Sequence, residues 1–211
     1  LGFELGKCEV PAIRLRMLAH LRTIDETLAE GVAGRLGVAE LPEPATPAVP
    51  VQDVAPSPAL SILANPPASF AGRKVGVLVA KGFDAALLTE LNAALQGEGA
   101  MVELIAPTVG GAISGDGTQV AAHHAVEGAP SVLFDAVCLL MPRPGAEALC
   151  RETPALDFVK DAFVHCKVIG FSQGAVPLLA AAGVLPDADE GMLELRAGSA
   201  AEYVALCRRM R

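Results

Sequence analysis

The fold is decided by the run RKVGVLVA, residues 73–80. It is a nearly continuous apolar stretch opened by two basic residues, which is typical of a strand buried on both faces. A helical pattern follows from Asp84 to Gly97, and Asp84 is placed to cap that helix. Because a buried strand running into a helix is the repeating unit of α/β folds, we expect the same alternation further along the chain.

The chain after Gly97 repeats this alternation. Apolar runs predict strands over residues 101–106, 136–141 and 168–171. Apolar stripes at helical spacing predict helices over residues 154–165 and 199–206, and the capping box Ser199-Ala200-Ala201-Glu202 would start the second. We therefore predict a three-layer α/β/α domain of the flavodoxin-like kind over residues 72–211, with a parallel sheet covered on both faces.

The first part of the chain, residues 1–38, has a different pattern. Apolar residues recur three or four positions apart, at Ile13, Met17, Leu21, Ile24, Leu28 and Val32. The capping box Thr23-Ile24-Asp25-Glu26 predicts a helix start and Gly37 predicts its end. Two amphipathic helices with one apolar stripe each cannot form a core alone. We expect them to pack on something absent from this sequence, or on the α/β domain.

Residues 39–71 form a proline-rich strap between these parts. Eight of the 16 prolines fall here, a spacing that disfavours helices and sheet ladders. A disordered linker is one interpretation. The apolar segment Ala59-Leu60-Ser61-Ile62-Leu63 favours the other, an ordered strap that lies along a neighbouring surface.

Composition excludes several classes of protein. The mean hydropathy is +0.45, but no apolar run approaches the ~18–20 residues of a spanning helix, so we expect no membrane span. A net charge of −8 argues against a nucleic-acid partner. The five Cys are scattered without C-x-x-C, so we expect reduced, mostly buried thiols in a cytoplasmic protein. Because the first residue is Leu1 and no signal segment follows, we expect the sequence to begin inside a longer protein.

One motif suggests catalysis. Gly170-Phe171-Ser172-Gln173-Gly174 matches G-x-S-x-G, the strand-to-helix elbow that presents the nucleophile of α/β-hydrolases. That fold needs a histidine after the serine, whereas every histidine precedes Ser172: His20, His123, His124 and His165. The favoured interpretation is a turn of small residues, and a catalytic serine is the alternative.

The other candidate groups are better explained by structural roles than by catalysis or ligand binding. His123-His124 lacks further ligands at metal spacing and is interpreted as a solvated loop pair. Gly110-Gly111 and Gly115-Asp116-Gly117 indicate turns, the second within a small hairpin after the second strand. His165-Cys166 could suggest a nucleophile and its base, but neighbours at a helix end rarely align, so burial is expected. We predict no catalytic, cofactor-binding or metal residue in this chain.

Several blocks of the sequence resemble large-subunit haem catalases, in the family's own order along essentially the whole chain. Residues 3–14 (FELGKCEVPAIR) and 20–37 (HLRTIDETLAEGVAGRLG) resemble the end of the haem-bearing part of these enzymes. The strap through Ser61-Ile62 is similar to the family's connector. Three further blocks resemble its C-terminal domain, at residues 72–79, 129–137 and 158–167.

The resemblance implies a parent enzyme and an appended domain. The parent would be a cytoplasmic homotetrameric haem catalase that dismutates hydrogen peroxide to water and oxygen in the response to oxidative stress. The domain would be similar to class I glutamine amidotransferases and to PfpI-like proteases and chaperones. Active relatives place a cysteine at the elbow where this chain has Ser172, while Cys166 lies on the wrong side of the strand. Asp84 stands roughly where PfpI-like members keep an acidic partner.

The resemblance carries over no haem residue. The family's distal His and Asn and its proximal Tyr lie upstream of this segment, and Tyr203, in the final helix, is the only Tyr. Haem is thus expected in the full-length parent and not in this part. A structural role follows, in which the domain stabilises the enzyme and caps its tetramer. The alternatives are a stand-alone PfpI-like hydrolase or holding chaperone with Ser172 at its elbow, and a pure oligomerisation module.

Overall fold

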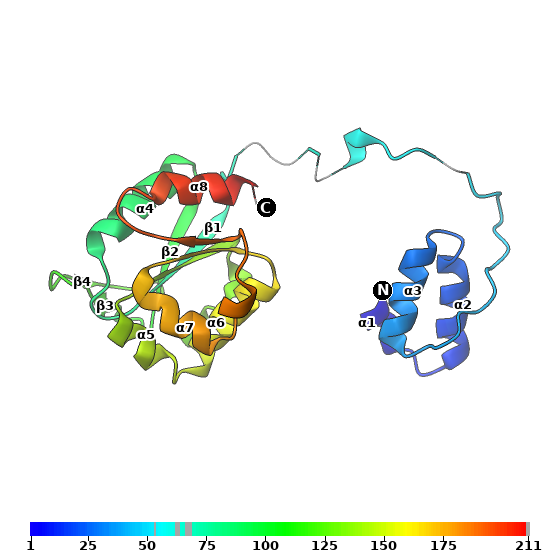
Figure 1. Ribbon diagram of the computed structural model, residues 1–211, viewed down its shortest axis with the longest axis horizontal. Helices are drawn as coiled ribbons and strands as arrows, with labels where there is room; N and C mark the ends of the chain where they lie inside the picture. Colours follow the sequence, from blue (N-terminus) through cyan, green and yellow to red (C-terminus); the bar gives the residue numbers. More distant parts are fainter. Residues whose placement is uncertain (53, 62–63, 66–68, 210–211) are drawn as a thin grey trace. The chain divides into compact units, whose positions relative to one another are not determined.

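The structure is a computed structural model and describes residues 1–52, 54–61, 64–65 and 69–209. The chain divides into two compact units, Leu1–Ser61 and Ile62–Arg211 (Figure 1). The first is helical and the second contains the sheet.

Three helices form the first unit: α1 (Gly2–Gly6), α2 (Pro11–Leu21) and α3 (Glu26–Leu36). The expectation of two helices without a core was wrong in part, because a small shared core exists, made of Leu5, Leu18, Leu21, Ala29, Val32 and Ala33. The rest of the predicted stripe stays outside it, since Ile13 is 46% exposed and Ile24 is 72% exposed. Part of the apolar face is therefore uncovered within this unit.

The start of α3 corrects the predicted capping box. Asp25 is the N-cap residue, and its carboxylate accepts a hydrogen bond from the amide of Leu28. The Thr23 hydroxyl instead donates to the carbonyl of His20, at the end of α2. The turn between the helices therefore uses Thr23 to close one helix and Asp25 to open the next. Gly37 ends α3 as predicted, at a φ of 68°.

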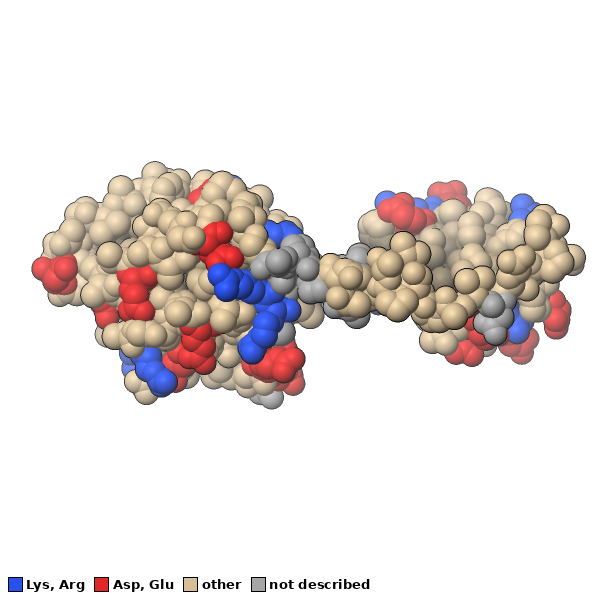
Figure 2. All heavy atoms as spheres, turned by 90° about the horizontal axis from the view of Figure 1, so that it is seen from above, with Lys and Arg blue, Asp and Glu red and all other residues tan. Residues whose placement is uncertain are grey.

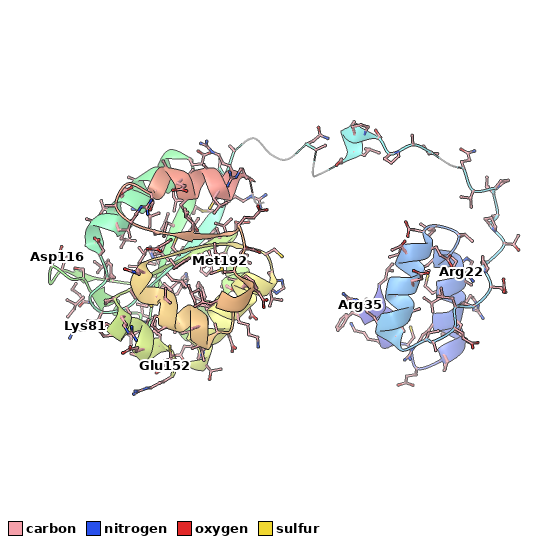
Figure 3. The ribbon with its side chains drawn as sticks, viewed as in Figure 1. Arg22, Arg35, Lys81, Asp116, Glu152 and Met192 are labelled. Atoms are coloured by element: carbon pink, nitrogen blue, oxygen red, sulfur yellow. The ribbon has the colours of Figure 1, made fainter. Side chains whose placement is uncertain are left out.

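The strap begins against this unit. Arg22, which Figure 3 labels on the helical unit, pairs with Glu26 and donates to the carbonyl of Pro42. Further along, Pro58–Leu60 forms a single 3-10 turn, η1, in which Leu60 is 85% exposed. Residues 62–63, the end of the predicted apolar segment, lie outside the described residues.

The second unit contains a six-stranded sheet in the order β5-β2-β1-β6-β7-β8, and every pair in it is parallel. The predicted strands are confirmed as β1 (Lys74–Val79), β2 (Met101–Ala106), β6 (Ala136–Leu140) and β7 (Val168–Phe171). Two short edge strands complete it, β5 (His124–Ala125) and β8 (Met192–Glu194).

Helices cover both faces of the sheet (Figure 1). One face packs against α4 (Ala85–Gly97) and α8 (Ala200–Arg209). The other face packs against α5 (Arg143–Leu149), α6 (Thr153–Val164) and α7 (Val176–Ala181). Single 3-10 turns lie between these elements: η2 (Val126–Gly128), η3 (Ser131–Leu133), η4 (Gln173–Ala175) and η5 (Leu185–Asp187). The three-layer α/β/α prediction is confirmed. In the described part of the chain, no helix combines the length and apolar character needed to span a membrane.

The predicted hairpin is confirmed as β3 (Ala112–Ile113) paired antiparallel with β4 (Gln119–Val120). Gly117 supplies the positive φ of the turn, at 91°. This β3–β4 arm docks on the loop between β1 and α4, because the amide of Gly82 donates to the carbonyl of Ile113 and that of Gly115 to the carbonyl of Phe83.

The start of α8 differs from the predicted capping box. The Ser199 hydroxyl exchanges hydrogen bonds with the backbone of Arg196. The Glu90 carboxylate, on α4, accepts from the amides of Gly198 and Ala200. One amide at the start of α8 and one just before it are thus paired with a neighbouring helix, which ties α8 to α4 on the same face of the sheet.

Candidate functional site

The G-x-S-x-G segment lies where the motif predicts, directly after β7. Ser172 has φ −72° and ψ 151°, an ordinary extended conformation. A nucleophile elbow instead holds its serine in a strained turn that exposes the hydroxyl. Here the hydroxyl accepts from the amide of Met141 at 3.0 Å and donates to the carbonyl of the same residue at 2.9 Å. Ser172 is therefore a clasp between the carboxyl ends of β6 and β7.

The last glycine of the motif, Gly174, allows two backbone segments to pack closely. A Cβ at Gly174 would lie 2.3 Å from the carbonyl oxygen of Met141 and 2.7 Å from the Cα of Pro142. Only a residue without a side chain allows the backbone after β7 to approach the backbone after β6 so closely. The small residues of the motif thus bring two chain segments together, which is the turn interpretation of this segment.

Within the described part of the α/β unit, the structure brings no histidine to Ser172. His20 belongs to the helical unit. His165 precedes β7 whereas Ser172 follows it, so His165 and Ser172 lie at opposite ends of one strand. His123 and His124 are engaged at the far edge of the sheet, at β2 and β5. Asp84 caps α4 by accepting from the amides of Ala86 and Leu87. Within the described part of the α/β unit, the histidines therefore form no serine–histidine pair with Ser172.

The solvated loop pair predicted for His123-His124 is confirmed in part: His123 is exposed and lies outside the strands, whereas His124 is half-buried in β5. The His123 ring nitrogen Nδ1 accepts from the amide of Leu104 at 2.8 Å. His124 lies within β5, and its Nε2 is 2.7 Å from the carboxylate of Glu103, which also pairs with Lys74. The prediction failed for His124 because a two-residue edge strand leaves no apolar pattern to detect.

Glu103 is a group that the sequence did not indicate. Hydrogen bonding to Lys74, and then to His124, lowers the pKa of its carboxyl group against the opposing effect of burial. The three side chains come from three adjacent strands, β1, β2 and β5. No motif precedes any of them, so only the sheet order brings them together.

The cysteines differ from the prediction of mostly buried thiols. Cys166 is exposed, as is His165, so burial of that pair was wrong. The reason is local: Cys166 follows the end of α6 at φ 53°, where the chain turns at the surface before entering β7. Cys138 and Cys207 are buried, and burial raises the pKa of Cys207 to about 12 and that of Cys138 further still. Thiols in such surroundings are poor nucleophiles.

The residues present do not fit a haem group. Tyr203 is fully buried and its hydroxyl donates to the carbonyl of Val137 at 2.9 Å, so it has no access to an iron atom. Burial also raises its pKa well above the ordinary value, which opposes the phenolate form. Within the described ranges, no three His, Cys, Asp or Glu side chains converge as a metal site would require. The glycines at 110–111 lie in a turn, where Gly111 donates to the carbonyl of Thr108.

The architecture has a counterpart among solved structures. Oxidized DJ-1 of Toxoplasma gondii superposes with a TM-score of 0.56 and 16% sequence identity, covering 63% of this chain and 87% of that one. At this identity the likeness concerns the fold alone.

Curated proteins give a closer match. Catalase C of Rhizobium meliloti is 52% identical over 209 residues, which is 97% of this chain and 29% of that protein. Catalase HPII of Mycobacterium avium is 37% identical, over 87% of this chain and 26% of that protein. The chain therefore spans less than a third of the length of these relatives. Residues 71–204 match the family described as the C-terminal domain found in long catalases. With that match across the α/β unit, the chain belongs to this family of long-catalase C-terminal domains.

Proposed function

We propose that this chain is the C-terminal part of a cytoplasmic haem catalase and that its α/β unit has a structural role without chemistry of its own. The parent enzyme would dismutate hydrogen peroxide to water and oxygen, with its haem pocket in the preceding part of the protein. In this proposal the α/β unit stabilises the enzyme and caps its homotetramer. The observation that carries the proposal is the clasp between Ser172 and Met141, which occupies the one hydroxyl that the motif offers as a nucleophile.

The relatives' lengths support the first half of the proposal. Catalase C of Rhizobium meliloti extends well beyond the matched region, which is 29% of its length. The additional length leaves room for a haem-binding domain, and Tyr203 has no access to such a group in this unit. When bound, haem supplies the redox chemistry of peroxide dismutation. The described residues of this chain would contribute no ligand to it.

The uncovered apolar face of the helical unit supports the second half. Phe3 is 76% exposed, Ile24 is 72% exposed and Ile13 is 46% exposed. Phe3 also lines a hollow together with Leu28 and Val32, and exposed apolar side chains around such a hollow commonly mark an interaction surface. We infer that the preceding part of the catalase covers this face, so that the helical unit anchors the chain to the enzyme and the strap leads to the α/β unit.

The α/β unit has the properties of a stable accessory module. Its sheet is covered on both faces, with two buried clusters of apolar residues. Acidic and basic side chains are interspersed on the face of this unit that Figure 2 presents. Such a module can add buried area and interface contacts to a tetramer without a reaction site.

The test uses the long catalase that carries this chain, intact and with residues 72–211 deleted. We expect the truncated enzyme, freshly prepared in the cold, to keep its rate per haem within about two-fold. We expect its melting temperature to fall by about 5 °C or more and its tetramer to dissociate at lower urea concentration. Calorimetry measures the melting temperature, and native mass spectrometry measures the dissociation of the tetramer.

A Ser172→Ala variant of the same enzyme separates structure from chemistry. Its peroxide turnover should match that of the intact enzyme. An unchanged melting temperature and tetramer after the deletion would contradict the structural role. Ester hydrolysis by the 211-residue chain that Ser172→Ala abolishes would contradict the absence of chemistry and favour a hydrolase.

A further inference from the structure

A cavity of about 450 Å³ lies between α4, the outer part of β2 and the β3–β4 arm. Strands β1 and β6 separate β2 from β7, which Ser172 follows, and residues 170–174 do not line the cavity. The arm is an insertion after β2, so this cavity is built by a part of the chain that the sheet itself does not need. Its lining is Ala85, Leu88, Thr89, Asn92, Val102, Leu104, Asp116, Thr118, Val120, Ala121 and His123.

The walls of the cavity are mostly apolar. Leu88 on α4, Val102 on β2 and Val120 on β4 are partly buried and pack against the core on this face of the sheet. Leu104 lies deeper, at 5% exposure. A volume of this size with apolar walls and a few polar groups is the usual form of a site for a small organic molecule.

His123 is a fixed part of the wall. Its backbone amide donates to the carbonyl of Leu104 and its ring Nδ1 accepts from the amide of Leu104, both at 2.8 Å. Because Nδ1 is an acceptor in this arrangement, the neutral ring carries its proton on Nε2. The imidazole therefore needs no rearrangement to present an apolar face and one donor to a ligand.

Asp116 gives the cavity its charge. It lies on the arm, at the margin of the unit (Figure 3), and is the one lining residue with a full charge at neutral pH. The hydrogen bond from the Ser114 hydroxyl, together with the amide of Thr118, lowers the pKa of its carboxyl group. Both of these bonds fall on Oδ1. The ionised carboxylate is thus held in place with no Lys or Arg in the lining to neutralise it.

We propose that this cavity binds a small organic cation, a protonated amine on an apolar or aromatic body. The body lies against Leu88, Val102 and Val120, and the ammonium group faces the carboxylate of Asp116. The amide of Asn92 and the Nε2 proton of His123 are the remaining polar contacts available to substituents. An anion of the same shape is rejected, because no cation in the lining would meet its charge.

The experiment titrates the 211-residue chain, labelled with ¹⁵N, with phenethylammonium. Phenylacetate serves as the matched anion and 2-phenylethanol as the matched neutral compound. We expect saturable amide shifts at Asn92, Asp116, Thr118 and His123 with the amine, with a dissociation constant near 1 mM as an order of magnitude for so small a molecule. The anion should bind at least about ten-fold more weakly.

Two variants and one control variant make the result specific. Asp116→Asn keeps the shape of the side chain and should bring the affinity for the amine down to that for the neutral alcohol. Leu88→Trp fills the cavity without changing charge and should abolish the shifts, whereas Glu127→Gln removes an exposed carboxylate that does not line the cavity and should leave them unchanged. Equal binding of amine and anion, shifts spread over other carboxylates, or no saturation below about 10 mM would overturn the proposal.

Discussion

The hydroxyl of Ser172 accepts from the amide of Met141 and donates to its carbonyl, at 3.0 and 2.9 Å, so that one side chain completes both backbone groups of a residue in the neighbouring segment. Buried backbone groups that lose their partner cost free energy. The serine of this G-x-S-x-G motif is therefore expected to matter for folding. It holds together the carboxyl ends of β6 and β7.

Replacing Ser172 by alanine leaves the amide and carbonyl of Met141 without this partner. The free energy of unfolding of the 211-residue chain should fall by about 1–2 kcal/mol. Urea unfolding followed by circular dichroism measures the change. Ser172→Thr, which keeps the hydroxyl, is the control and should lose less. Equal stability of the alanine variant and the native chain would show that water replaces the clasp.

Gly174→Ala is predicted to be the more damaging change at this turn. Its Cβ would meet backbone atoms at 2.3 and 2.7 Å, which cannot be relieved by rotating a side chain. We expect a loss above about 3 kcal/mol, or failure to fold. Gly97→Ala is the matched control, because its Cβ would have no neighbour within 4 Å and the site ends a helix. The control should be neutral or slightly stabilising.

Much of the fold could be predicted because its strands are long enough to carry a pattern. The sequences of β1 and β6 are apolar almost throughout, which predicts buried strands. Asp84 predicted the start of α4 because aspartate is a common N-cap residue. The edge strands β5 and β8 could not be found, since two or three residues at an exposed edge show no periodicity.

Contacts between distant residues account for the remaining failures. The prediction that Ser172 lacks a general base rested on the order of residues, because every histidine precedes it in the chain. The actual role of Ser172 could not be predicted from this order, because Met141 is 31 positions away in the sequence. The cap of α8 is a similar case: Glu90 is 110 positions from Ala200, so local rules favoured Ser199 instead. Local patterns predict elements, while the partners of polar side chains depend on the packing of the whole unit.

The burial of Tyr203 can be tested by its ultraviolet absorbance. No other residue contributes a phenolate signal, since the chain has no Trp and no other Tyr. Burial raises the pKa of Tyr203 well above the ordinary value of 10. A raised pKa in the folded state means that stability is complete below pH ~10 and is lost as the pH rises beyond it, because only the unfolded state releases the proton readily. Phenolate absorbance should therefore appear together with alkaline unfolding and not before it.

Tyr203→Phe tests the hydrogen bond to the carbonyl of Val137. The variant leaves a buried carbonyl without its donor, so we expect a loss of about 1–2 kcal/mol at neutral pH. The alkaline decline in stability should also become shallower, because the titrating group is gone. A phenolate signal from the native chain while it is still folded would contradict both expectations.

The ion pairs of Glu103 should make the stability of the chain depend on pH in the acidic range. Its pKa is lowered in the folded state by Lys74 and His124, so its contribution to stability is present above the unfolded value near pH ~4.3 and is lost as the pH falls through the folded value. Glu103→Gln should be less stable than the native chain at pH 7, and the difference should shrink in acid. Glu194→Gln, at an exposed position of β8, is the control. A difference that stays constant with pH would exclude the ion pairs as its cause.

Cys166 is the one residue other than glycine with a positive φ among the described residues, at 53°. It follows the end of α6 in a pattern that usually ends in glycine: its amide donates to the carbonyl of Phe163, and the amide of Lys167 donates to that of Ala162.

A Cβ costs about 1 kcal/mol in this conformation, so Cys166→Gly should stabilise the chain by about that amount. Cys166→Ala keeps the Cβ and should not. Because the thiol is exposed, its removal sacrifices little packing. Equal gains from glycine and alanine in urea unfolding would show that the thiol, and not the backbone, carries the cost.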